Sequence, residues 1–392
     1  MHTTHLSLTD VAQVADSVSQ FIDAARRRIY APDAVKKPPE YSLSQLSAAA
    51  RIPKGTLGTR IAKPTDKLPK GRHKGGGRYF TLDEVRQWAR HFETSWRRLP
   101  SQEGLRMVVA NFKGGVSKTT TTAHLAQGLA LRGYDVLLID LDAQGSLTST
   151  MGISPEFEVE PEHTIVPLTS GETDSLAGAI RKTYWPGVDI VPGSVALNNA
   201  DFFLPSRQAR DPGFAFWDVL GGALRRDGLQ YRYDYIIIDT PPAISYLTIN
   251  AFWAADAMLV PMPPEGPDFV SSSQFWALFA QLSDGIQNRL LQMGGKNKIY
   301  DWARIVPTKV DRQRTHTDVV LQWMRSAYEG LVTDVEIPMT SAVSVSGVQM
   351  GTVYDIGKYE GAARTYQRAR QAYDQLIDEV DRLTRATRWA QP

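Results

Sequence analysis

The sequence predicts an α/β protein with a doubly wound, mostly parallel sheet, preceded by an N-terminal part that is all helical apart from one small wing. Two observations support this fold class. From residue 106 onward, mostly continuous apolar segments alternate with helical patterns, as expected of a parallel sheet that helices cover on both faces. Before residue 100, helical spacing and basic residues dominate instead. The expected strands are 106–111, 135–140, 187–192, 234–239, 256–261, 302–308 and 333–337.

The composition sets the size and class of the protein. The chain has 392 residues, enough for two or three domains, and 42% of them are hydrophobic. We expect an N-terminal helix and linker at 1–38, a small domain at 39–100 and an α/β domain at 101–392. Cysteine is absent, which excludes disulfides, iron–sulfur clusters and cysteine-ligated zinc. No signal-peptide pattern is visible, and no apolar run approaches the roughly 18–20 residues of a membrane span. We therefore expect a cytoplasmic protein with no membrane association.

The segment 8–30 predicts one amphipathic helix. Its apolar residues recur at steps of three and four: Val11, Val14, Val18, Phe21, Ile22, Ala25 and Ile29. Pro32, Pro38 and Pro39 then mark a linker. The apolar face of a lone helix needs a cover. A second copy of the chain is our preferred cover, and packing on the chain's own domain is the alternative.

The small domain predicts a helix–turn–helix followed by a wing and a further helix. Ser42 and Gln45 form a capping-box pattern that starts the first helix, and Pro53 suits the start of the second. In this motif the second helix enters the major groove of DNA. The basic, glycine-rich segment 63–78 predicts the wing, and a second capping box opens at Thr81. The arrangement resembles the winged helix-turn-helix of MerR-type regulators.

The charge of the small domain supports nucleic-acid binding. Residues 31–100 hold 15 Lys/Arg and 6 Asp/Glu, a net charge of 15 − 6 = +9, while the whole chain carries only +2. A solvated basic face on a protein-interaction domain is the alternative. The candidate DNA contacts here are Lys54, Thr56, Arg60, Lys74 and Arg78.

A glycine-rich loop joins the first strand of the α/β domain to its first helix. The loop follows a β-branched strand, and no Asp or Glu occupies the first turn of the helix, where acids are usually favoured. Free backbone N–H groups, the helix dipole and a lysine together make a seat for phosphate. A glycine turn with no ligand is the alternative. The candidate nucleotide-binding residues are Lys113, Gly114, Gly115, Val116, Ser117, Lys118, Thr119 and Thr120.

The loop has the form K-G-G-x-x-K-T-T, a variant of the Walker A motif in which Ser117 replaces the usual glycine before the lysine. It resembles the deviant Walker A loop of the ParA/MinD family of P-loop ATPases. The resemblance implies that Lys118 binds phosphate and that the Thr119 hydroxyl binds magnesium. It also implies that Lys113 reaches the nucleotide of the other subunit in an ATP-bound homodimer.

Two strand ends extend the resemblance. Asp140-Leu-Asp142-Ala-Gln-Gly is similar to the family's D-x-D-P-Q-G, with alanine in place of proline, and Asp239-Thr-Pro-Pro is similar to its Walker B ending. The resemblance implies that Asp142 positions and activates the attacking water, and that Asp140 and Asp239 lie at the magnesium ion. Carboxylates that only cap a strand–loop junction are the alternative. Thr308 and Lys309 are candidates for the adenine contact.

The C-terminal segment 362–387 predicts a long amphipathic helix with basic residues near its start. Docking on the α/β domain, a basic surface for non-specific DNA and a membrane helix as in MinD are the possible roles. Acidic residues argue against the membrane helix, because they dilute the positive face that anionic lipids require. Candidate DNA contacts outside the small domain are Arg314, Lys358 and Arg364.

Taken as a whole, the resemblance implies a ParA-type plasmid partition ATPase of the larger class that uses ATP/ADP and Mg²⁺. It implies a homodimer that binds non-specific chromosomal DNA, and hydrolysis stimulated by a ParB-type partner. It further implies a nucleoid-associated protein whose N-terminal domain binds operator DNA and represses its own operon. The alternatives are a nucleotide-gated transcriptional repressor and a MinD-like membrane-positioning ATPase.

Overall fold

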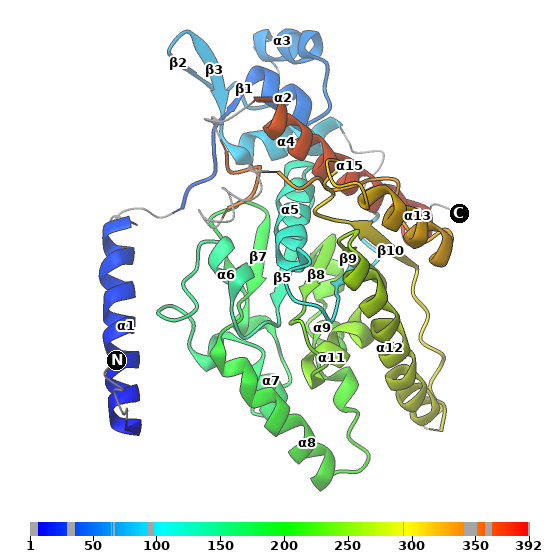
Figure 1. The fold of residues 1–392 in the computed structure, drawn as a ribbon. Coiled ribbons are helices and arrows are strands. Elements are labelled where there is room, and N and C mark those ends of the chain that lie inside the picture. Colours follow the sequence, from blue (N-terminus) through cyan, green and yellow to red (C-terminus); the bar gives the residue numbers. More distant parts are fainter. Residues whose placement is uncertain are drawn as a thin grey trace. The chain divides into compact units, whose positions relative to one another are not determined.

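The computed structural model describes residues 7–29, 36–63, 65, 67–92, 98–292, 294–340, 351–356 and 363–390. These residues fall into two compact units, Met1–Lys37 and Pro38–Pro392, and each is described by itself. Their helices and strands are labelled in Figure 1.

The first unit contains one helix, α1 (Leu8–Ile29), close to the predicted bounds. Ser7 and Asp10 cap it, since the Asp10 N–H donates to Ser7 Oγ at 3.1 Å and the Ser7 N–H donates to the Asp10 carboxylate at 2.7 Å. Four apolar side chains of the predicted stripe are described, and all are exposed: Val11 at 51%, Val14 at 52%, Val18 at 50% and Phe21 at 74%.

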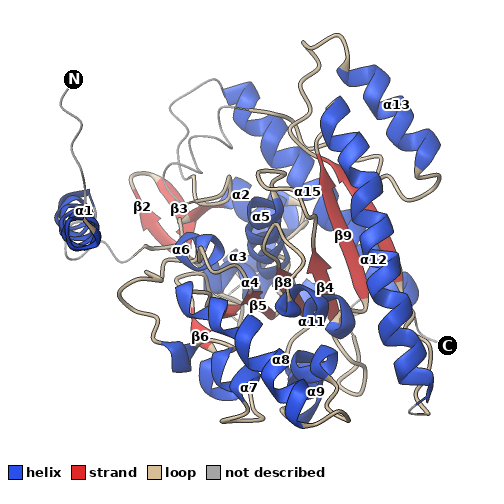
Figure 2. Cartoon of the chain, turned by 60° about the horizontal axis from the view of Figure 1, so that its bottom comes forward, coloured by secondary structure: helices blue, strands red, loops and turns tan. Residues whose placement is uncertain are grey.

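The centre of the second unit is a seven-stranded sheet with strand order β10-β9-β4-β8-β5-β7-β6. All neighbouring strands are parallel except the edge pair β6 and β7, which is antiparallel. The doubly wound, mostly parallel sheet predicted from the sequence is confirmed, and helices lie on both sides of it (Figure 2). The strands are β4 (Leu105–Val109), β5 (Val136–Asp140), β6 (Arg181–Lys182), β7 (Val188–Val191), β8 (Tyr235–Asp239), β9 (Ala257–Met262) and β10 (Trp302–Pro307).

One predicted strand is wrong. Residues 333–337 form no strand, although the segment runs beside β10 and makes isolated bridges at Val332 and Pro338. The Thr333 and Ile337 N–H groups donate to carbonyls of β10, but Pro338 has no N–H and the residues between leave the ladder. The short edge strand β6 carries too little apolar sequence to be recognised beforehand.

Each face of the sheet has its own hydrophobic core, and alternate residues of a strand belong to different cores. Met107 and Val109 of β4 pack with α5 (Lys118–Leu131) and α15 (Ala363–Thr387). Val108 packs on the opposite face. The other helices are α6 (Ser146–Thr150), α7 (Val166–Ser170), α8 (Ala200–Arg210), α9 (Val219–Arg226), α10 (Leu229–Arg232), α11 (Tyr246–Ala254), α12 (Gly266–Gln292) and α13 (Thr317–Ala327).

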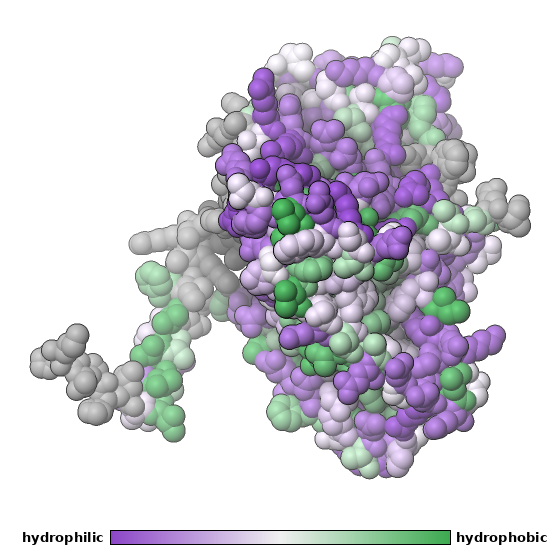
Figure 3. All heavy atoms as spheres, turned by 45° about the vertical axis from the view of Figure 1, so that its right-hand side comes forward, coloured by the Kyte–Doolittle hydropathy of each residue, from purple (hydrophilic) through white to green (hydrophobic). Residues whose placement is uncertain are grey.

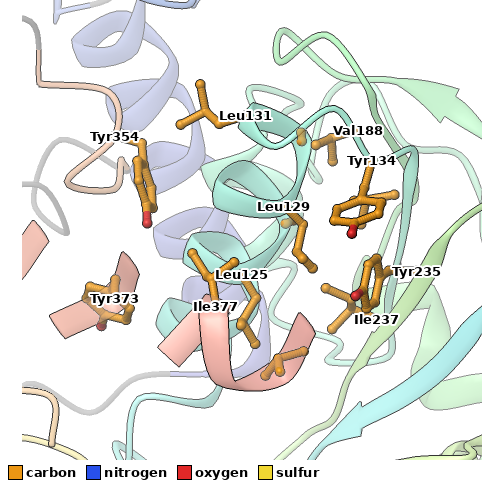
Figure 4. Close-up of a cluster of buried hydrophobic side chains, with 14 of the residues drawn as sticks. Leu125, Leu129, Leu131, Tyr134, Val188, Tyr235, Ile237, Tyr354, Tyr373 and Ile377 are labelled. Carbon is orange, nitrogen blue, oxygen red and sulfur yellow. The ribbon is translucent and has the colours of Figure 1, made fainter. Parts of the chain in front are cut away.

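Helix α5 is buried between the sheet and α15. Leu125 and Leu129 of α5 lie with Tyr235 and Ile237 of β8 on one side, and Ile377 of α15 lies on the other (Figure 4). Nearly every residue of α5 is buried. A ligand at the N-terminus of α5 would therefore bind to a helix that is packed in the core on all sides.

The N-terminal elements of the second unit match the predicted order. They are β1 (Tyr41–Ser42), α2 (Leu43–Ala49), α3 (Lys54–Ala62), β2 (Arg72–Lys74), β3 (Gly77–Phe80) and α4 (Leu82–Phe92). Both capping boxes form: Gln45 N–H donates to Ser42 Oγ at 3.3 Å and Glu84 N–H to Thr81 Oγ1 at 3.3 Å. The strands make an antiparallel sheet in the order β1-β3-β2.

These elements pack on the α/β part and share its core. Arg86 of α4 is buried, and its guanidinium donates to the Ala130 and Tyr134 carbonyls at 3.0 and 2.9 Å and pairs with Asp135 at 2.7 Å. The predicted domain boundary at residue 100 therefore lies within one compact unit; that 39–100 folds independently stays a prediction. Within the described residues, no helix is long and apolar enough to cross a membrane.

Candidate functional site

The glycine-rich loop between β4 and α5 has the backbone of an anion-binding nest. Gly115 and Ser117 have φ values of 72° and 76°, both left-handed. Ser117 is the N-cap of α5, and no side chain caps the helix. The left-handed conformation costs a non-glycine residue about 1–2 kcal/mol, and such strain is retained mainly where a site requires it. The backbone N–H groups of this turn are thus arranged for an anion.

Lys118 lies in the first turn of α5 with its ammonium turned back onto the loop. Lys118 Nζ donates to the Lys113 carbonyl at 3.0 Å, and the residue is 6% exposed. Burial lowers the pKa of Lys118, while the carboxylates of Asp239 and Asp142 act in the opposite direction. A buried lysine whose ammonium binds a carbonyl of the glycine-rich loop is positioned to bind phosphate at the same helix end.

Thr119 and Asp239 meet as the sequence predicts. Thr119 Oγ1 donates to the Asp239 carboxylate at 2.7 Å, and Thr122, one turn further along α5, donates to its other oxygen at 3.2 Å. Burial, followed by the charge of Asp140, raises the pKa of Asp239 to about 8. A buried carboxylate beside a second buried carboxylate and a hydroxyl fits a divalent cation with oxygen ligands. The residues therefore suit Mg²⁺.

Asp140 has a different environment from Asp239. Its two carboxylate oxygens accept hydrogen bonds from the Asp142 N–H at 3.1 Å and from the Thr148 N–H and hydroxyl at 3.0 and 2.7 Å. It is opposite Asp239 in the register of β5 and β8, and burial raises its pKa to about 6. These contacts fix the loop that carries Asp142. A contact of Asp140 with magnesium stays a prediction.

A cavity of about 400 Å³ opens at the N-terminus of α5. Eight of its lining residues were predicted from the sequence: Gly114, Gly115, Ser117, Lys118, Thr119, Thr120, Asp142 and Lys309. Seven were not: Ala123, His124, Ser146, Thr150, Pro242, Gly351 and Thr352. Helical spacing from Thr119 and Thr120 would have found Ala123 and His124, whereas Gly351 and Thr352 come from a distant segment with no sequence signal. The cavity thus brings the lysine, the threonine and the predicted water-activating carboxylate to one place.

The two adenine candidates are placed differently. Thr308 is buried, and its hydroxyl donates to the Val116 carbonyl at 3.0 Å, so it braces the glycine loop from behind. Val116 is also buried and does not line the cavity. Lys309 is exposed, has a φ of 53° and lines the cavity. Lys309 is therefore the better placed of the two for a ligand contact.

His124 closes one side of the cavity in a neutral form. Its Nδ1 lies 2.7 Å from the Thr120 carbonyl and its Nε2 accepts from the Val353 N–H at 3.2 Å, which assigns the proton to Nδ1. The ring stacks on Tyr373 of α15 at 3.6 Å. Burial lowers the pKa of His124 to about 3. His124 thus joins α5 to the segment that carries Gly351 and Thr352.

Lys113 forms an ion pair within its own chain. Lys113 Nζ lies 2.5 Å from the Asp268 carboxylate, and the lysine side chain is 40% exposed. Asp268 is not among the residues predicted from the sequence.

The candidate DNA contacts fall into several groups. Lys54 and Thr56 are exposed on α3, and Arg60 lies over the Phe92 ring. In the hairpin, Lys74 pairs with Glu40 at 3.2 Å, and Arg78 is bonded to the Lys70 carbonyl and His73. On the face drawn in Figure 3, hydrophilic side chains gather over the end of the second unit that carries these elements. Elsewhere, Arg314 pairs with Glu265 at 2.9 Å, Arg364 is exposed, and Lys358 is outside the described residues.

A glycine loop with a phosphate-oriented lysine, a threonine bonded to a strand-end aspartate and a second aspartate across one cavity define a P-loop nucleotide-binding protein. Comparison with known proteins narrows this class. A family model described as an AAA domain matches residues 106–292. The chromosome partitioning protein ParA of Caulobacter vibrioides is 32% identical over 238 residues, which cover 61% of this chain and 82% of that protein. The chain belongs to the ParA family of partition ATPases.

Two further relatives match more of the chain. The protein SopA of Escherichia coli is 29% identical over 344 residues, 84% of this chain and 85% of SopA. A Rhizobium rhizogenes protein that carries the description replication protein A is 29% identical over 390 residues, 96% of this chain and 94% of that protein. The likeness thus extends through the N-terminal elements.

Solved structures support the fold. A partition protein matches 95% of this chain and 98% of its own with a TM-score of 0.64, at 18% identity. Cobyrinic acid a,c-diamide synthase from Mycobacterium smegmatis, bound to an ATP analogue and magnesium, matches 73% of this chain and 98% of its own, with a TM-score of 0.55 and 26% identity.

Proposed function

We propose that this chain binds ATP with Mg²⁺, hydrolyses it to ADP and phosphate, and uses that cycle to segregate plasmid DNA. The observation that carries the proposal is the single cavity at the N-terminus of α5, lined by Lys118, Thr119 and Asp142, with Asp239 bonded to Thr119. The Mycobacterium smegmatis synthase, which shares this fold, binds an ATP analogue and magnesium, and this supports the choice of ligand.

Each residue has a defined part in the proposed reaction. The N–H groups of residues 114–120 and the Lys118 ammonium bind the phosphates and neutralise their charge. Thr119 and Asp239 supply oxygen ligands for Mg²⁺, which when bound stabilises the negative charge that develops on the phosphate oxygens. Asp142 orients the attacking water and accepts its proton. Lys309 is proposed to contact the base or ribose at the cavity mouth, with Thr308 holding the loop.

The proposal includes an ATP-dependent dimer. Lys113 of each subunit would reach the nucleotide of the other, so that the triphosphate joins two α/β domains face to face. The exposed apolar stripe of α1 supports a second, nucleotide-independent contact between copies, because a stripe of this size is normally buried against a partner. In the assembled state we propose binding of non-specific chromosomal DNA, with Arg314, Lys358 and Arg364 as candidate contacts. Release would follow hydrolysis stimulated by a ParB-type partner.

The N-terminal elements are proposed to bind operator DNA and repress the chain's own operon. The exposed residues of α3 support this, because Lys54 and Thr56 are available for contact while Leu57 and Ile61 of the same helix are buried. We expect α3 in the major groove, with the β2–β3 hairpin on the phosphate backbone.

ATP turnover and retention on non-specific DNA test the proposal. The wild-type chain should hydrolyse ATP slowly, and faster with DNA and partner present. It should be retained on DNA with ATP, less so at higher salt. Asp142→Ala should keep ATP-dependent retention while turnover is lost, and Lys118→Ala should lose both. Absence of turnover with DNA and partner present would contradict the ATPase and favour a repressor in which nucleotide is only a regulatory ligand.

A further inference from the structure

Lys113 is held by its own chain through one buried carboxylate. Its ammonium lies 2.5 Å from Asp268 Oδ1, and the Asp268 side chain is only 9% exposed, against 40% for the lysine. Asp268 lies in the first turn of α12. Apart from this ion pair, its buried Oδ1 has no hydrogen-bond partner among the described residues. The charge of Lys113 is therefore the main compensation for this oxygen, with a smaller contribution from the N-terminus of α12.

The backbone of Lys113 is also fixed from both sides. The Lys113 N–H donates to Asn111 Oδ1 at 3.0 Å, and its carbonyl accepts from Lys118 Nζ at 3.0 Å. The second bond involves the lysine that is proposed to bind phosphate. The same ammonium therefore links the backbone of Lys113 to the proposed phosphate site of its own subunit.

These contacts conflict with the role of Lys113 in the proposed dimer. The ammonium cannot lie against a buried carboxylate of its own subunit and against a triphosphate of the other at the same time. We propose that Asp268 is a positioning residue that anchors Lys113 in the unassembled chain, and that the face-to-face dimer forms only by breaking this ion pair. The inference rests on the proposed ATP-dependent dimer.

The anchoring effect comes from the Asp268 carboxylate, which is left without its counter-charge when Lys113 moves away. Separating a buried ion pair leaves a carboxylate with no counter-charge, which strongly opposes the separation. The triphosphate of the other subunit must outweigh Asp268 before the two domains stay together. Asp268 thus sets the nucleotide concentration at which the dimer forms, and it keeps Lys113 from binding weaker anions.

Replacing Asp268 with asparagine tests this role, because the amide keeps the shape and removes the charge. The chain has no cysteine, so Val195→Cys, at a 75% exposed position, gives one labelling site for donor and acceptor dyes. Energy transfer between full-length copies is then measured against the concentration of a non-hydrolysable ATP analogue with Mg²⁺. We expect Asp268→Asn to lower the half-maximal concentration by about tenfold or more, since one tenfold step corresponds to a small part of the penalty for a separated buried pair.

Asp318→Asn is the matched control. Asp318 is also a first-turn acid of a helix, α13, but it pairs with Arg312 and its side chain is 64% exposed. We expect the half-maximal analogue concentration of the Asp318→Asn variant to equal that of the wild type. Asp268→Ala should shift the midpoint in the same direction as Asp268→Asn, which guards against an effect peculiar to asparagine.

The outcomes separate this inference from the proposed function. An unchanged or higher midpoint in both Asp268 variants, with the wild type responding to the analogue, would overturn the anchoring role alone. No analogue-dependent energy transfer in the wild type would overturn the dimer and the inference together. As a second readout, acetylation of Lys113 without nucleotide, followed by mass spectrometry, should rise in Asp268→Asn relative to exposed Lys309. Equal labelling in wild type and variant would contradict the anchor.

Discussion

Gly128 of α5 packs directly against Ile377 of α15. A Cβ atom at Gly128 would lie 2.0 Å from Ile377 Cδ1 and 3.0 Å from the Tyr354 hydroxyl. A larger residue at this position requires the Ile377 side chain to shift, so the glycine allows the close approach between the two helices.

Gly128→Ala should therefore destabilise the protein although alanine favours helices. Overpacking a tight core costs about 1–3 kcal/mol, against a gain of about 1 kcal/mol in helix propensity. We expect a lower urea midpoint. Adding Ile377→Val, which removes the clashing Cδ1 atom, should recover part of the loss. If the double variant were less stable than the sum of the single variants predicts, the clash would not be the cause.

Arg86→Met should destabilise the contact between α4 and the end of α5. The substitution removes the guanidinium donor from the Tyr134 and Ala130 carbonyls, of which the Ala130 carbonyl keeps the Gly133 N–H, and we expect a loss of about 2 kcal/mol in the free energy of unfolding. Arg90 also pairs with Asp135, at 2.6 Å, but its side chain is 39% exposed. Arg90→Met should therefore cost under about 1 kcal/mol. Equal losses in both variants would contradict the importance of the buried carbonyl contacts.

Ser117→Gly should stabilise the chain without loss of nucleotide binding. Glycine adopts the φ of 76° without strain, so we expect a gain of up to about 1 kcal/mol. Gly115→Ala is the matched opposite, because a Cβ there meets no atom within 4 Å and the φ is +72°. Gly115→Ala should lower the free energy of unfolding by a similar amount through backbone strain alone. Urea unfolding of both variants measures the pair, and a destabilised Ser117→Gly would show that the hydroxyl, not the backbone, governs this position.

His124 should make stability depend on acid. Its pKa in the folded chain is about 3, against a usual value of 6.5. Because the pKa of His124 is lower in the folded chain, the unfolded chain binds the proton first as pH falls. The contribution of neutral His124 to the free energy of unfolding is therefore complete above pH 6.5 and is lost as pH falls toward 3. At pH 5 we expect the free energy of unfolding to be about 2 kcal/mol lower than at neutral pH because of this one group.

The measurement for His124 is a comparison with His124→Asn at pH 7.5 and pH 5. The raised pKa values of Asp140 and Asp239, about 6 and about 8, act in the opposite direction, because those groups bind protons in the folded chain first. Only the difference in pH dependence between wild type and variant isolates the histidine. Identical pH dependence of the two proteins would contradict the buried neutral ring.

The phosphate seat could be predicted because its residues are contiguous. Eight consecutive positions, 113–120, follow one strand and start one helix, so local backbone chemistry is enough to identify them. The pairing of Thr119 with Asp239 followed from sheet topology, since α5 starts from the loop at the carboxyl end of β4, and the neighbouring strand β8 ends at Asp239. The six predicted strands that form were equally accessible, because a strand covered on both faces is a continuous apolar run.

The remaining features depend on tertiary contacts that no local pattern encodes. Asp268 looks like an ordinary first-turn acid until α12 is placed beside the glycine loop. His124 reads as one more residue of a buried helix. Gly351 and Thr352 are placed at the cavity by contacts with α5, where the Thr352 hydroxyl binds Gln127 and the Val353 N–H binds His124. The segment 333–337 is apolar enough for a strand, but its pairing with β10 is interrupted within the fold.

The contact of α4 with α5 has a consequence for shortening the chain. Arg98, just before the α/β part, binds Asp234 at 2.8 Å and the Tyr231 carbonyl at 2.7 Å, while Arg86 covers the opposite end of the helix that begins at the phosphate seat. A minimal ATPase made by deleting the first hundred residues would lose both attachments and uncover apolar side chains that α2 and α4 now shield. Such a fragment should be prone to aggregation, so the proposed ATPase and the proposed DNA-binding function have to be separated by point substitutions and not by truncation.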